Sequence, residues 1–466
     1  MKKALFLILL FASFVAMAQP VTKRKATAIA QSFLNGNGQS YTVESIKVHA
    51  DSAGNQQFFI INAQPESYVI VSADAQLSPI LAWSRTSQFL ASDGYLPMLE
   101  SAIHQYQTWA VSLSESARQK IDNQWKTLSK KSYSPPRAQC WPPAGTTSTE
   151  GWLETRWTQT APYNQMCPRD PSTQSASYAG CPAIVMGQIV NYLRTTQNTR
   201  FDDSDDYAHN YDGRNYMIDD DAETIGFPSF PVLNNWLDSA DAQFAIDEDV
   251  TDNLAAAIVF ACGTACTQVY TSQGSGTFAV NQAYQAYQRF GFENCELFEQ
   301  TDSTMYATLI DNLKNGYPAH LAVVDEAWST GHNVAVDGYR EDGYFHINFG
   351  WGGQSDGWWL IPDPSFPYSL GVLEGIVLNI IPNHVGLNET TAPDNLTVYP
   401  NPATQTIHLQ SITTDSVQYS IYSMNGVRVK TGHTNGTISV ADLSAGTYLL
   451  QVVTGKGLQT AKVVVE

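Results

Sequence analysis

The chain has 466 residues, 43% hydrophobic and 11% aromatic. This composition excludes wholesale disorder, and the length indicates about three domains rather than one core. The chain carries 25 Lys and Arg against 44 Asp and Glu, a formal net charge of −19, and it has no basic stripe, so it is not expected to bind nucleic acid.

The first eighteen residues have the pattern of a secretory signal peptide. Two lysines at positions 2 and 3 precede an apolar run over residues 4–15, and the small-residue sequence at 16–18 gives the cleavage site. The run is shorter than the roughly 18 apolar residues that a membrane-spanning helix needs, and no later stretch reaches that length. The sequence therefore predicts an exported protein with no transmembrane segment, in a compartment where disulfides are allowed.

Residues 19–136 are predicted to form a small α+β domain. A helical pattern of apolar residues runs from Ala26 to Leu34, and strand patterns follow at 57–61 and 68–72. A second helical pattern runs from Leu96 toward Trp109.

Charge separates this front segment from the one that follows. Residues 19–136 have 10 Lys and Arg against 8 Asp and Glu, whereas residues 137–382 have 9 against 31. A difference of this kind is compatible with docking of the two segments on each other. Residues 129–149, rich in Lys, Pro, Ser and Thr, are typical of an exposed linker that a protease could cut.

The middle segment, residues 137–382, contains a cysteine at the start of a helical pattern. Its apolar stripe consists of Ala183, Met186, Ile189, Val190 and Leu193. Pro182 favours the first helical position, which would place Cys181 at the N-cap. The helix dipole and the unpaired amides there favour a thiolate, the form in which cysteine is a nucleophile. Taken alone, Cys181 is equally compatible with a buried small residue or half of a disulfide.

A candidate base lies in a predicted hairpin over residues 331–349. Two alternating strands flank the turn sequence Asp342-Gly343. If Val336 pairs with Tyr344, His332 lies opposite Asn348, whose amide could then fix the imidazole tautomer. Cys181, His332 and Asn348 would form the Cys-His-Asn version of the nucleophile triad.

Two further residues bear on this site. His346 is a rival base on the same strand face, interpreted as structural because it lacks an obvious orienting partner. Gln159 stands in the string W-x-Q-x-x-P-Y-N about twenty residues before Cys181. With the Cys181 backbone N–H, its amide would supply two donors for the oxyanion of a tetrahedral intermediate.

Together these motifs resemble the secreted streptopain-like cysteine peptidases, a branch of the papain-like fold. The resemblance runs through 157–164, the Gly180-Cys181 helix, Ser275-Gly276 and 331–357 with its N-x-G-W-G-G core. It implies a papain-like α+β domain and an endopeptidase working through a thioacyl-enzyme. The catalytic residues implied are Cys181 as nucleophile, His332 as base, Gln159 in the oxyanion hole and Asn348 orienting His332. The substrate-binding residues implied are Trp351, Phe349, Ser275 and Gly276. The family usually has Trp where Phe349 stands and an apolar residue where Pro182 stands.

The resemblance extends to both flanks. Residues 68–74 look like the propeptide string of this family, whose pro-domain folds on the enzyme and blocks its cleft. The resemblance and the exposed linker imply a zymogen, and the alternative is a stable accessory domain. Residues 396–466 show short alternating runs and an Asn425-Gly426 turn, which predict a β-sandwich. The strings at 398–402 and 443–448 resemble the type IX secretion sorting domain. That implies export through the outer membrane to the medium or the cell surface, with residues 383–395 as a linker.

No cofactor or metal is predicted, and reducing conditions are expected to favour activity. Acidic runs at 202–206, 219–221 and 247–252 lack the calcium-binding loop pattern, which makes calcium a minor alternative. Cys262 and Cys266 have helical spacing without a nearby His, which argues against zinc. Peptides and proteins are the expected substrates. The alternatives left open are an amidase or transglutaminase on the same Cys and His, and a non-enzymatic surface adhesin of the same fold.

Overall fold

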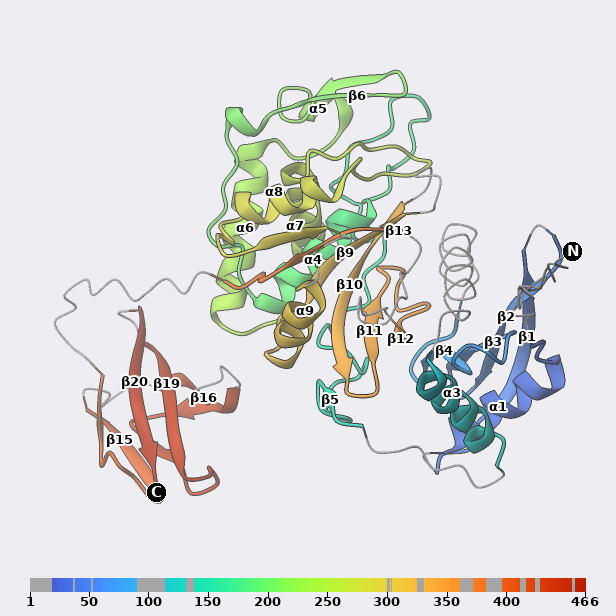
Figure 1. Ribbon diagram of the computed structural model, residues 1–466. Helices are drawn as coiled ribbons and strands as arrows, with labels where there is room; N and C mark the ends of the chain where they lie inside the picture. Colours follow the sequence, from blue (N-terminus) through green and yellow to red (C-terminus); the bar gives the residue numbers. More distant parts are fainter. Residues whose placement is uncertain are drawn as a thin grey trace, which may run out of the picture. The chain divides into compact units, whose positions relative to one another are not determined.

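The computed structural model describes residues 19–36, 38–51, 53–89, 114–130, 138–299, 302, 304–324, 331–360, 372–382, 396–410, 416–423, 428–454 and 457–466 (Figure 1). It divides into two compact units, Met1–Asn383 and His384–Glu466, each described here by itself. The predicted signal peptide, the helical pattern after Leu96, the linker 383–395 and the Asn425-Gly426 turn lie outside the described residues.

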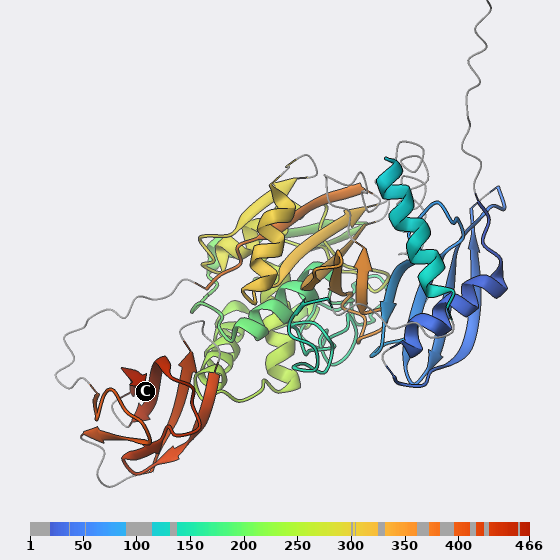
Figure 2. The same cartoon turned by 60° about the horizontal axis from the view of Figure 1, so that its bottom comes forward.

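The front segment is an α+β pro-domain, as its pattern predicts. Its elements are α1 Lys23–Asn35, β1 Thr42–Ala50, β2 Gln56–Gln64, β3 Ser67–Ser72, β4 Ile80–Ser84 and α3 Glu115–Leu128. The Thr22 side chain accepts the Lys25 N–H and begins α1, and Ser114 caps α3 in the same way. Both helices lie along one face of the four strands (Figure 2). The Trp125 indole holds α3 in place by donating to the Leu77 carbonyl at 2.8 Å.

The middle segment combines helices with the other half of the same sheet. Its elements are β5 Cys140–Trp141, α4 Cys181–Leu193, η1 Asp203–Asp205, β6 Ala208–Tyr211, β7 Arg214–Met217, α5 Ala222–Ile225, α6 Phe230–Ala245, α7 Asp252–Ala265, α8 Val280–Arg289, β8 Glu296–Glu299, α9 Met305–Lys314, β9 Ala319–Val324, β10 Gly331–Arg340, β11 Tyr344–Asn348, β12 Gly357–Leu360 and β13 Val372–Leu378. The long strands form one sheet in the order β1-β2-β3-β4-β12-β11-β10-β9-β13-β8. Pro-domain strand β4 therefore pairs directly with β12, Trp83 opposite Trp358.

Two hydrophobic cores lie on the two sides of the β9 to β13 region, because successive side chains of a strand point to opposite faces. Core 1 contains the pro-domain interior, α9 and the inward side chains of β10, β11 and β12, among them Val334, Phe345 and Trp359. Core 2 contains α4, α6, α7 and α8 with Ala322 and Ala335 of the sheet. The helix that carries Cys181 belongs to core 2.

The predicted linker 129–149 is too long. β5 pairs with the end of β10, Trp141 opposite Tyr339, and the two rings stack at 5.9 Å. Thr149 is buried, and the Trp152 N–H donates to the Asp337 carbonyl at 2.8 Å. Within the described residues, the segment from Gln139 onward is thus already part of the middle domain. The Pro-rich composition was misleading because Pro142, which lies at a bend, directly follows the paired strand β5.

The predicted hairpin is present, but the predicted register is wrong. Ala335, not His332, lies opposite Asn348, and Val336 pairs with Ile347 rather than Tyr344. The turn falls at 341–343, with Gly343 at φ 94°, and Arg340 is still the last residue of β10, so the pairing is centred later in the chain than predicted. A bulge between Val336 and Gly338 moves the pairing by one more residue.

The C-terminal unit confirms the β-sandwich prediction. Its strands are β14 Thr397–Tyr399, β15 Thr406–Gln410, β16 Val417–Ser423, β17 Arg428–Thr434, β18 Thr437–Ser439, β19 Gly446–Thr454 and β20 Gly457–Val465. They form a three-stranded sheet, β14-β15-β18, and a four-stranded sheet, β17-β16-β19-β20. Ile407 and Ile438 of the first sheet share a core with Ile421 and Leu450 of the second. Among the described residues of the whole chain, no helix is long and apolar enough to cross a membrane.

Candidate active site

Cys181 is the first residue of α4, one position further into the helix than predicted. Gly180 is the N-cap, at φ 86°, and Pro182 follows Cys181 in the first turn. A side chain at position 180 would clash, because an added Cβ would lie 2.6 Å from the Gln268 Oε1. Gln268 also donates to the Ala179 carbonyl at 2.7 Å, which fixes the approach to the helix. Cys181 therefore projects from a rigid helix N-terminus and is partly exposed.

His332 lies near the start of β10 against two aromatic rings. Its ring stacks on Trp351 with centroids 4.6 Å apart, and its Nε2 bonds to the Phe349 carbonyl at 2.9 Å. Burial lowers the pKa of the His332 imidazole to about 4, and the bond to Phe349 offsets part of that effect. Because Nε2 donates to a carbonyl, Nδ1 is the nitrogen available to accept a proton.

The Cys181 sulfur contacts Asn333, the neighbour of His332. The Asn333 amide Nδ2 donates to Sγ at 3.6 Å, and within the described part of the chain no hydrogen bond joins Cys181 to His332. Burial raises the pKa of the Cys181 thiol, while hydrogen bonds from Asn333 lower it in part. In this unprocessed chain the thiol and the imidazole are therefore both neutral at pH 7.

Asn348 does not bond to His332 as predicted, because the register places it elsewhere. Its Oδ1 accepts the Gln188 amide at 3.1 Å and the Gly350 N–H at 3.0 Å, and its Nδ2 donates to the Thr155 carbonyl at 3.0 Å. The Gly350 N–H belongs to the same peptide unit as the Phe349 carbonyl that receives His332. Asn348 therefore fixes the peptide on which His332 rests, one step removed from the ring.

Gln188 is a site residue that the sequence analysis missed. This residue lies on α4, two turns after Cys181, and is fully buried. Its Oε1 accepts a hydrogen bond from the Thr155 hydroxyl at 2.8 Å and one from the Trp157 N–H at 3.3 Å. It thus ties the helix to the 155–157 segment and to Asn348. A polar residue within an otherwise apolar helix was the available signal.

Gln159 lies beside the N-terminus of α4 through its backbone. Its carbonyl accepts the Ala179 N–H at 2.8 Å, two residues before Cys181. On its other side, Thr158 bridges to Trp351, and the Trp157 carbonyl accepts the Gly352 N–H at 2.9 Å. The 157–159 segment thus runs between the nucleophile helix and the loop that carries Trp351.

The four predicted substrate-binding residues differ in where the structure places them and in what their side chains contact. Trp351 is partly exposed beside His332, and Gly276 faces the nucleophile helix, with an added Cβ only 3.9 Å from Pro182. The Ser275 hydroxyl is used within its own turn, where it accepts the Thr271 N–H at 3.0 Å. Phe349 is completely buried between Trp351 and Trp359, so its predicted substrate contact is wrong. Phe349 directly follows Asn348, the buried last residue of β11, and this position places its ring behind the His332 ring.

His346 has an orienting partner that the sequence did not reveal. Its Nδ1 bonds to the Asp337 carboxylate at 2.6 Å, and both side chains are buried. Burial opposes charge on the ring, but Asp337 outweighs it and raises the pKa of His346. Nearby, Asp356 accepts the Phe349 N–H at 2.8 Å, and burial raises the pKa of this carboxyl to about 7. Among the described residues, no hydrogen bond joins His346 to Cys181.

The pro-domain contacts the loop that follows the Trp351 segment. The Ser355 N–H donates to the Gln88 carbonyl at 2.9 Å, and the Tyr68 hydroxyl donates to the Ser355 carbonyl at 2.8 Å. The Arg156 guanidinium reaches the Thr86 carbonyl at 3.2 Å. The pro-domain thus binds Ser355, at the end of the loop. Trp351, at the beginning of the same loop, supports His332.

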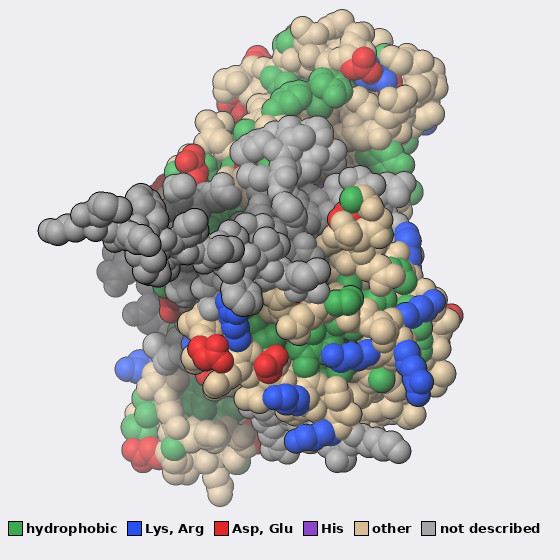
Figure 3. Space-filling view, turned by 45° about the vertical axis from the view of Figure 1, so that its right-hand side comes forward, with side chains coloured by type: hydrophobic (Ala, Val, Ile, Leu, Met, Phe, Trp, Pro, Cys, Tyr) green, Lys and Arg blue, Asp and Glu red, His purple; other side chains and the backbone are tan. Residues whose placement is uncertain are grey.

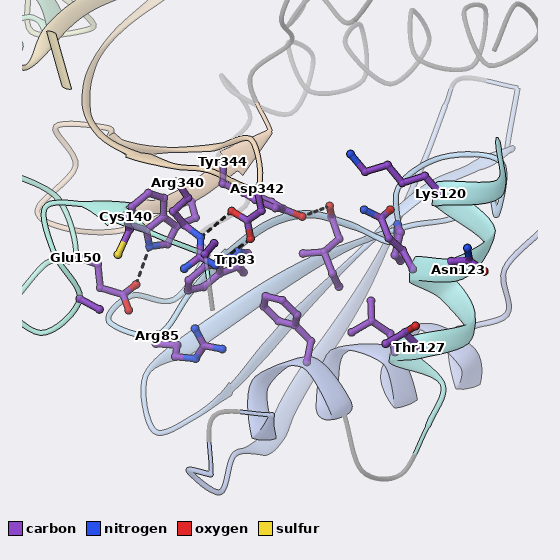
Figure 4. Close-up of a pocket in the computed structure, with 18 of the residues that line it drawn as sticks. Trp83, Arg85, Lys120, Asn123, Thr127, Cys140, Glu150, Arg340, Asp342 and Tyr344 are labelled. Atoms are coloured by element: carbon purple, nitrogen blue, oxygen red, sulfur yellow. Dashed lines mark hydrogen bonds and ion pairs between the residues drawn. The ribbon is translucent and has the colours of Figure 1, made fainter. Parts of the chain in front are cut away.

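A cavity of about 990 Å³ lies where the pro-domain meets the β10–β11 hairpin (Figure 4). Trp83 and Trp358 lie on one wall, with the Arg340 guanidinium 5.3 Å from the Trp83 ring and paired with Asp342. Helix α3 forms the opposite wall, including Lys120. Figure 3 shows Lys and Arg side chains gathered over the part of the pro-domain that carries α1 and α3.

The acidic runs considered for calcium serve as local hydrogen-bond partners. Asp202 and Asp205 form a capping box on η1, and Asp205 pairs with Arg289. Asp221 accepts the Met217 N–H at 2.8 Å, and Asp247 pairs with Arg194 at 3.2 Å. Within the described ranges, no group of three or more His, Cys, Asp or Glu side chains is placed to hold a metal ion, and the six cysteines are free thiols.

Comparison with known proteins assigns each segment. Residues 157–359 match the Peptidase C10 family, residues 18–109 match the Spi protease inhibitor family, and residues 397–466 match the secretion system C-terminal sorting domain. The thiol protease/hemagglutinin PrtT of Porphyromonas gingivalis is 23% identical over 369 residues, 75% of this chain and 40% of that protein. The chain thus spans two fifths of that relative's length.

Two solved structures from Prevotella intermedia are also similar. A mutant fragment of prointerpain A is 20% identical, with a TM-score of 0.48, and the match covers 72% of this chain and 98% of that one. Active interpain A is 23% identical, with a TM-score of 0.38, and the match covers 50% and 94%.

The matches confirm the resemblance to the streptopain-like peptidases and the order of propeptide, peptidase and sorting domains. Residues 157–359 are thus a cysteine-type peptidase domain similar to those of the Peptidase C10 family. The C-terminal sorting domain makes it a secreted or outer-surface protein.

Proposed function

We propose that the chain is the zymogen of a secreted cysteine endopeptidase. The observation that supports this most directly is the convergence of three separate segments at the N-terminus of α4. Cys181 begins the helix, Gln159 lies beside Ala179, and Asn333, next to His332, reaches the sulfur. These are the residue types that acyl transfer by a thiol requires: a nucleophile, a base and an oxyanion donor.

In the proposed mechanism, His332 Nδ1 takes the Cys181 proton and the thiolate attacks the carbonyl carbon of the scissile peptide bond. Gln159 and the Cys181 backbone N–H donate to the oxyanion that forms. The imidazolium then gives its proton to the leaving amine, and water hydrolyses the thioester with His332 again as base. Trp351 and the peptide held by Asn348 keep the imidazole in place through both steps.

The pro-domain is proposed to keep the enzyme inactive until it is cut away. Its strand β4 extends the peptidase sheet, and Tyr68 and Gln88 hold Ser355 at the end of the His332 support loop. Burial leaves both reacting groups neutral, which is unfavourable for a thiolate and imidazolium pair. Loss of the pro-domain would admit water to this side and raise the His332 pKa toward its usual value.

The test is incubation of purified residues 19–466 under mild reductant, with chain length followed by mass spectrometry and casein hydrolysis followed in parallel. The wild type is expected to lose its front segment by a cut between Leu128, where α3 ends, and Cys140, where β5 begins. Cys181→Ala should do neither, whereas Cys140→Ala, which removes the other partly exposed cysteine, should behave as wild type.

If the wild type does not process itself, a trace of a trypsin-like protease is added to cut at the lysines near 130. Continued absence of casein cleavage after that cut would reject the endopeptidase proposal. Faster acyl transfer to an added amine than to water would identify an amidase or transglutaminase instead.

A further inference from the structure

A buried chain of polar groups leads from the interior of core 2 to the Cys181 sulfur. The Tyr287 hydroxyl lies 3.2 Å from His320 Nδ1, and His320 Nε2 lies 2.8 Å from Asn333 Oδ1. The Asn333 Nδ2 lies 3.6 Å from Cys181 Sγ. Tyr287 comes from α8, His320 from β9 and Asn333 from β10, so three elements build it.

With the Asn333 amide oriented as in the structure, the donors and acceptors of this chain are mutually consistent. Since Asn333 Nδ2 donates to the sulfur, its Oδ1 is the acceptor that faces His320. His320 must then carry its proton on Nε2, which leaves Nδ1 to accept the Tyr287 O–H. Every group in the chain is satisfied, and each bond fixes the direction of the next.

Burial keeps this arrangement in a single state. Tyr287 and His320 have no exposed surface, and Asn333 is 9% exposed. Burial lowers the pKa of His320 to about 4, so the ring is neutral at physiological pH and keeps the tautomer that the chain requires. Turning the Asn333 amide over would also require the other His320 tautomer, and it would place Oδ1, an acceptor, against the sulfur, where it would repel a thiolate.

We infer that Asn333 is a further catalytic residue, a side-chain donor that stabilises the Cys181 thiolate, with His320 and Tyr287 as the positioning residues that aim it. When the Cys181 proton passes to His332, the sulfur gains a full negative charge and the N–H bond from Asn333 becomes charge-assisted. No proton leaves the Tyr287, His320 and Asn333 chain in this step.

The other groups that face the sulfur do not supply the same bond. His332 is the proposed proton acceptor, and Cys266, the C-cap residue of α7, whose pKa burial raises to about 12, stays a neutral thiol. Hydrogen bonding by Asn333, from its backbone and its side chain, opposes the burial that raises the Cys181 pKa. Removing the side chain leaves the backbone donor, so the expected effect is partial rather than complete.

The experiment measures alkylation of Cys181 by iodoacetamide from pH 5 to pH 9 in the full chain, quantified on the Cys181 peptide by mass spectrometry. At pH 6, Asn333→Ala is expected to slow alkylation about tenfold, because a pKa rise of about one unit removes nine tenths of the thiolate. Asn333→Asp should slow it further, because a carboxylate repels the thiolate.

Two His320 variants test the aiming role. His320→Gln retains an N–H donor toward Asn333 Oδ1 and is expected to stay within about threefold of wild type. His320→Leu removes the donor and should approach the Asn333→Ala rate. Asn312→Ala is the matched control, since Asn312 is also buried and hydrogen-bonded, to Asn379, in a part of the fold that does not contact Cys181.

A role in packing alone would give a different result. Asn333→Ala would then lower the thermal midpoint, as Asn312→Ala does, while its alkylation profile superimposed on wild type, and this outcome would overturn the inference. If Asn333→Ala does not fold, the comparison of His320→Gln with His320→Leu decides in the same way.

The inference rests on Cys181 as the proposed nucleophile, but alkylation requires no peptide substrate. A wild type that fails to cleave casein yet shows the Asn333-dependent profile would reject the peptidase proposal and retain the thiol donor. If the wild type cleaves casein and Asn333→Ala has the same alkylation profile as wild type, the peptidase proposal is retained and the role of Asn333 as thiol donor is rejected.

Discussion

The proposed nucleophile, Cys181, and the proposed base, His332, lie in regions of the molecule that are built differently. Cys181 begins a helix whose apolar face lies in core 2, formed by the peptidase domain alone. His332 rests on Phe349 and Trp351, which pack with core 1, and core 1 is shared with the pro-domain. Removal of the pro-domain therefore leaves the surroundings of the nucleophile intact and strips one wall from the region that holds the base.

The largest expected effect comes from truncating one aromatic residue in each core. Trp83 is 2% exposed and stacks on Trp358 at 6.0 Å, and Phe260 is fully buried in core 2. Trp83→Ala and Phe260→Ala should each lower the free energy of unfolding of the unprocessed chain by about 3–5 kcal/mol, measured by urea titration with circular dichroism.

The two variants should differ after maturation. The Trp83→Ala chain loses its altered segment and should give a mature domain as stable as wild type, whereas Phe260→Ala should keep its deficit. Wild-type stability of the unprocessed Trp83→Ala chain would show that core 1 does not depend on the pro-domain.

The second prediction concerns pH and the buried Asp356 on the base side. Its pKa is raised from 3.8 to about 7, mainly by burial, so the folded chain holds this proton up to about pH 7 and the unfolded chain only up to about pH 4. The stabilisation is complete below pH 4 and is lost as pH rises to 7, an effect of about 4 kcal/mol for roughly three pKa units. Asp356→Asn should remove this slope.

The measurement is the free energy of unfolding of wild type minus that of Asp356→Asn, at pH 4 to 8. His332, with its lowered pKa, contributes an opposite slope between pH 4 and 6.5, but that slope is common to both chains and cancels. A difference that is constant across the range would contradict the prediction.

The third and smallest effect tests the contact between strand β4 of the pro-domain and strand β12 of the peptidase domain. Gly357 has φ 157°, and an added Cβ would lie 2.5 Å from the Trp83 carbonyl and 2.8 Å from the Tyr68 hydroxyl, both in the pro-domain. Gly357→Ala should therefore separate β12 from β4, cost about 1–3 kcal/mol and shorten the half-time of maturation.

Gly343→Ala is the matched control, because Gly343 has φ 94° but open space around it. It should carry backbone strain without changing the maturation half-time, which is followed by mass spectrometry. Equal half-times for Gly357→Ala and wild type would mean that the β4–β12 contact does not hold the pro-domain.

Local patterns in the sequence predict the elements well and their pairing poorly. The helix over residues 26–34, the strands at 57–61 and 68–72 and the turn at Asp342-Gly343 are all confirmed. The pairing of Val336 with Tyr344 is wrong because a bulge and the length of a turn depend on contacts across the sheet, such as that between Asp337 and His346.

The site shows the same division. The nucleophile, base and oxyanion residues stand in recognisable strings, and their roles remain predictions for the variants above. Asn333 and Asp356 could not be found in this way, because each acts through a partner more than a hundred residues away or through a backbone group. Gln188 was marked only as a polar residue within an apolar helix, and its partner Asn348 could not be read from that pattern. Asn348 was predicted as the partner of the ring, but it holds the peptide behind the ring.

The pairing of β4 with β12 has a consequence for the proposed mature enzyme, because it determines whether copies can associate through an exposed sheet edge. Once the pro-domain leaves, β12 becomes the outer strand of the remaining sheet and exposes unpaired backbone groups, with Trp358 and Trp359 on it. Such an edge can template pairing with another copy. At four residues, Gly357–Leu360, it is short, and short edges resist that association. The short length of β12 is therefore the feature that would limit association of the mature domain through this edge.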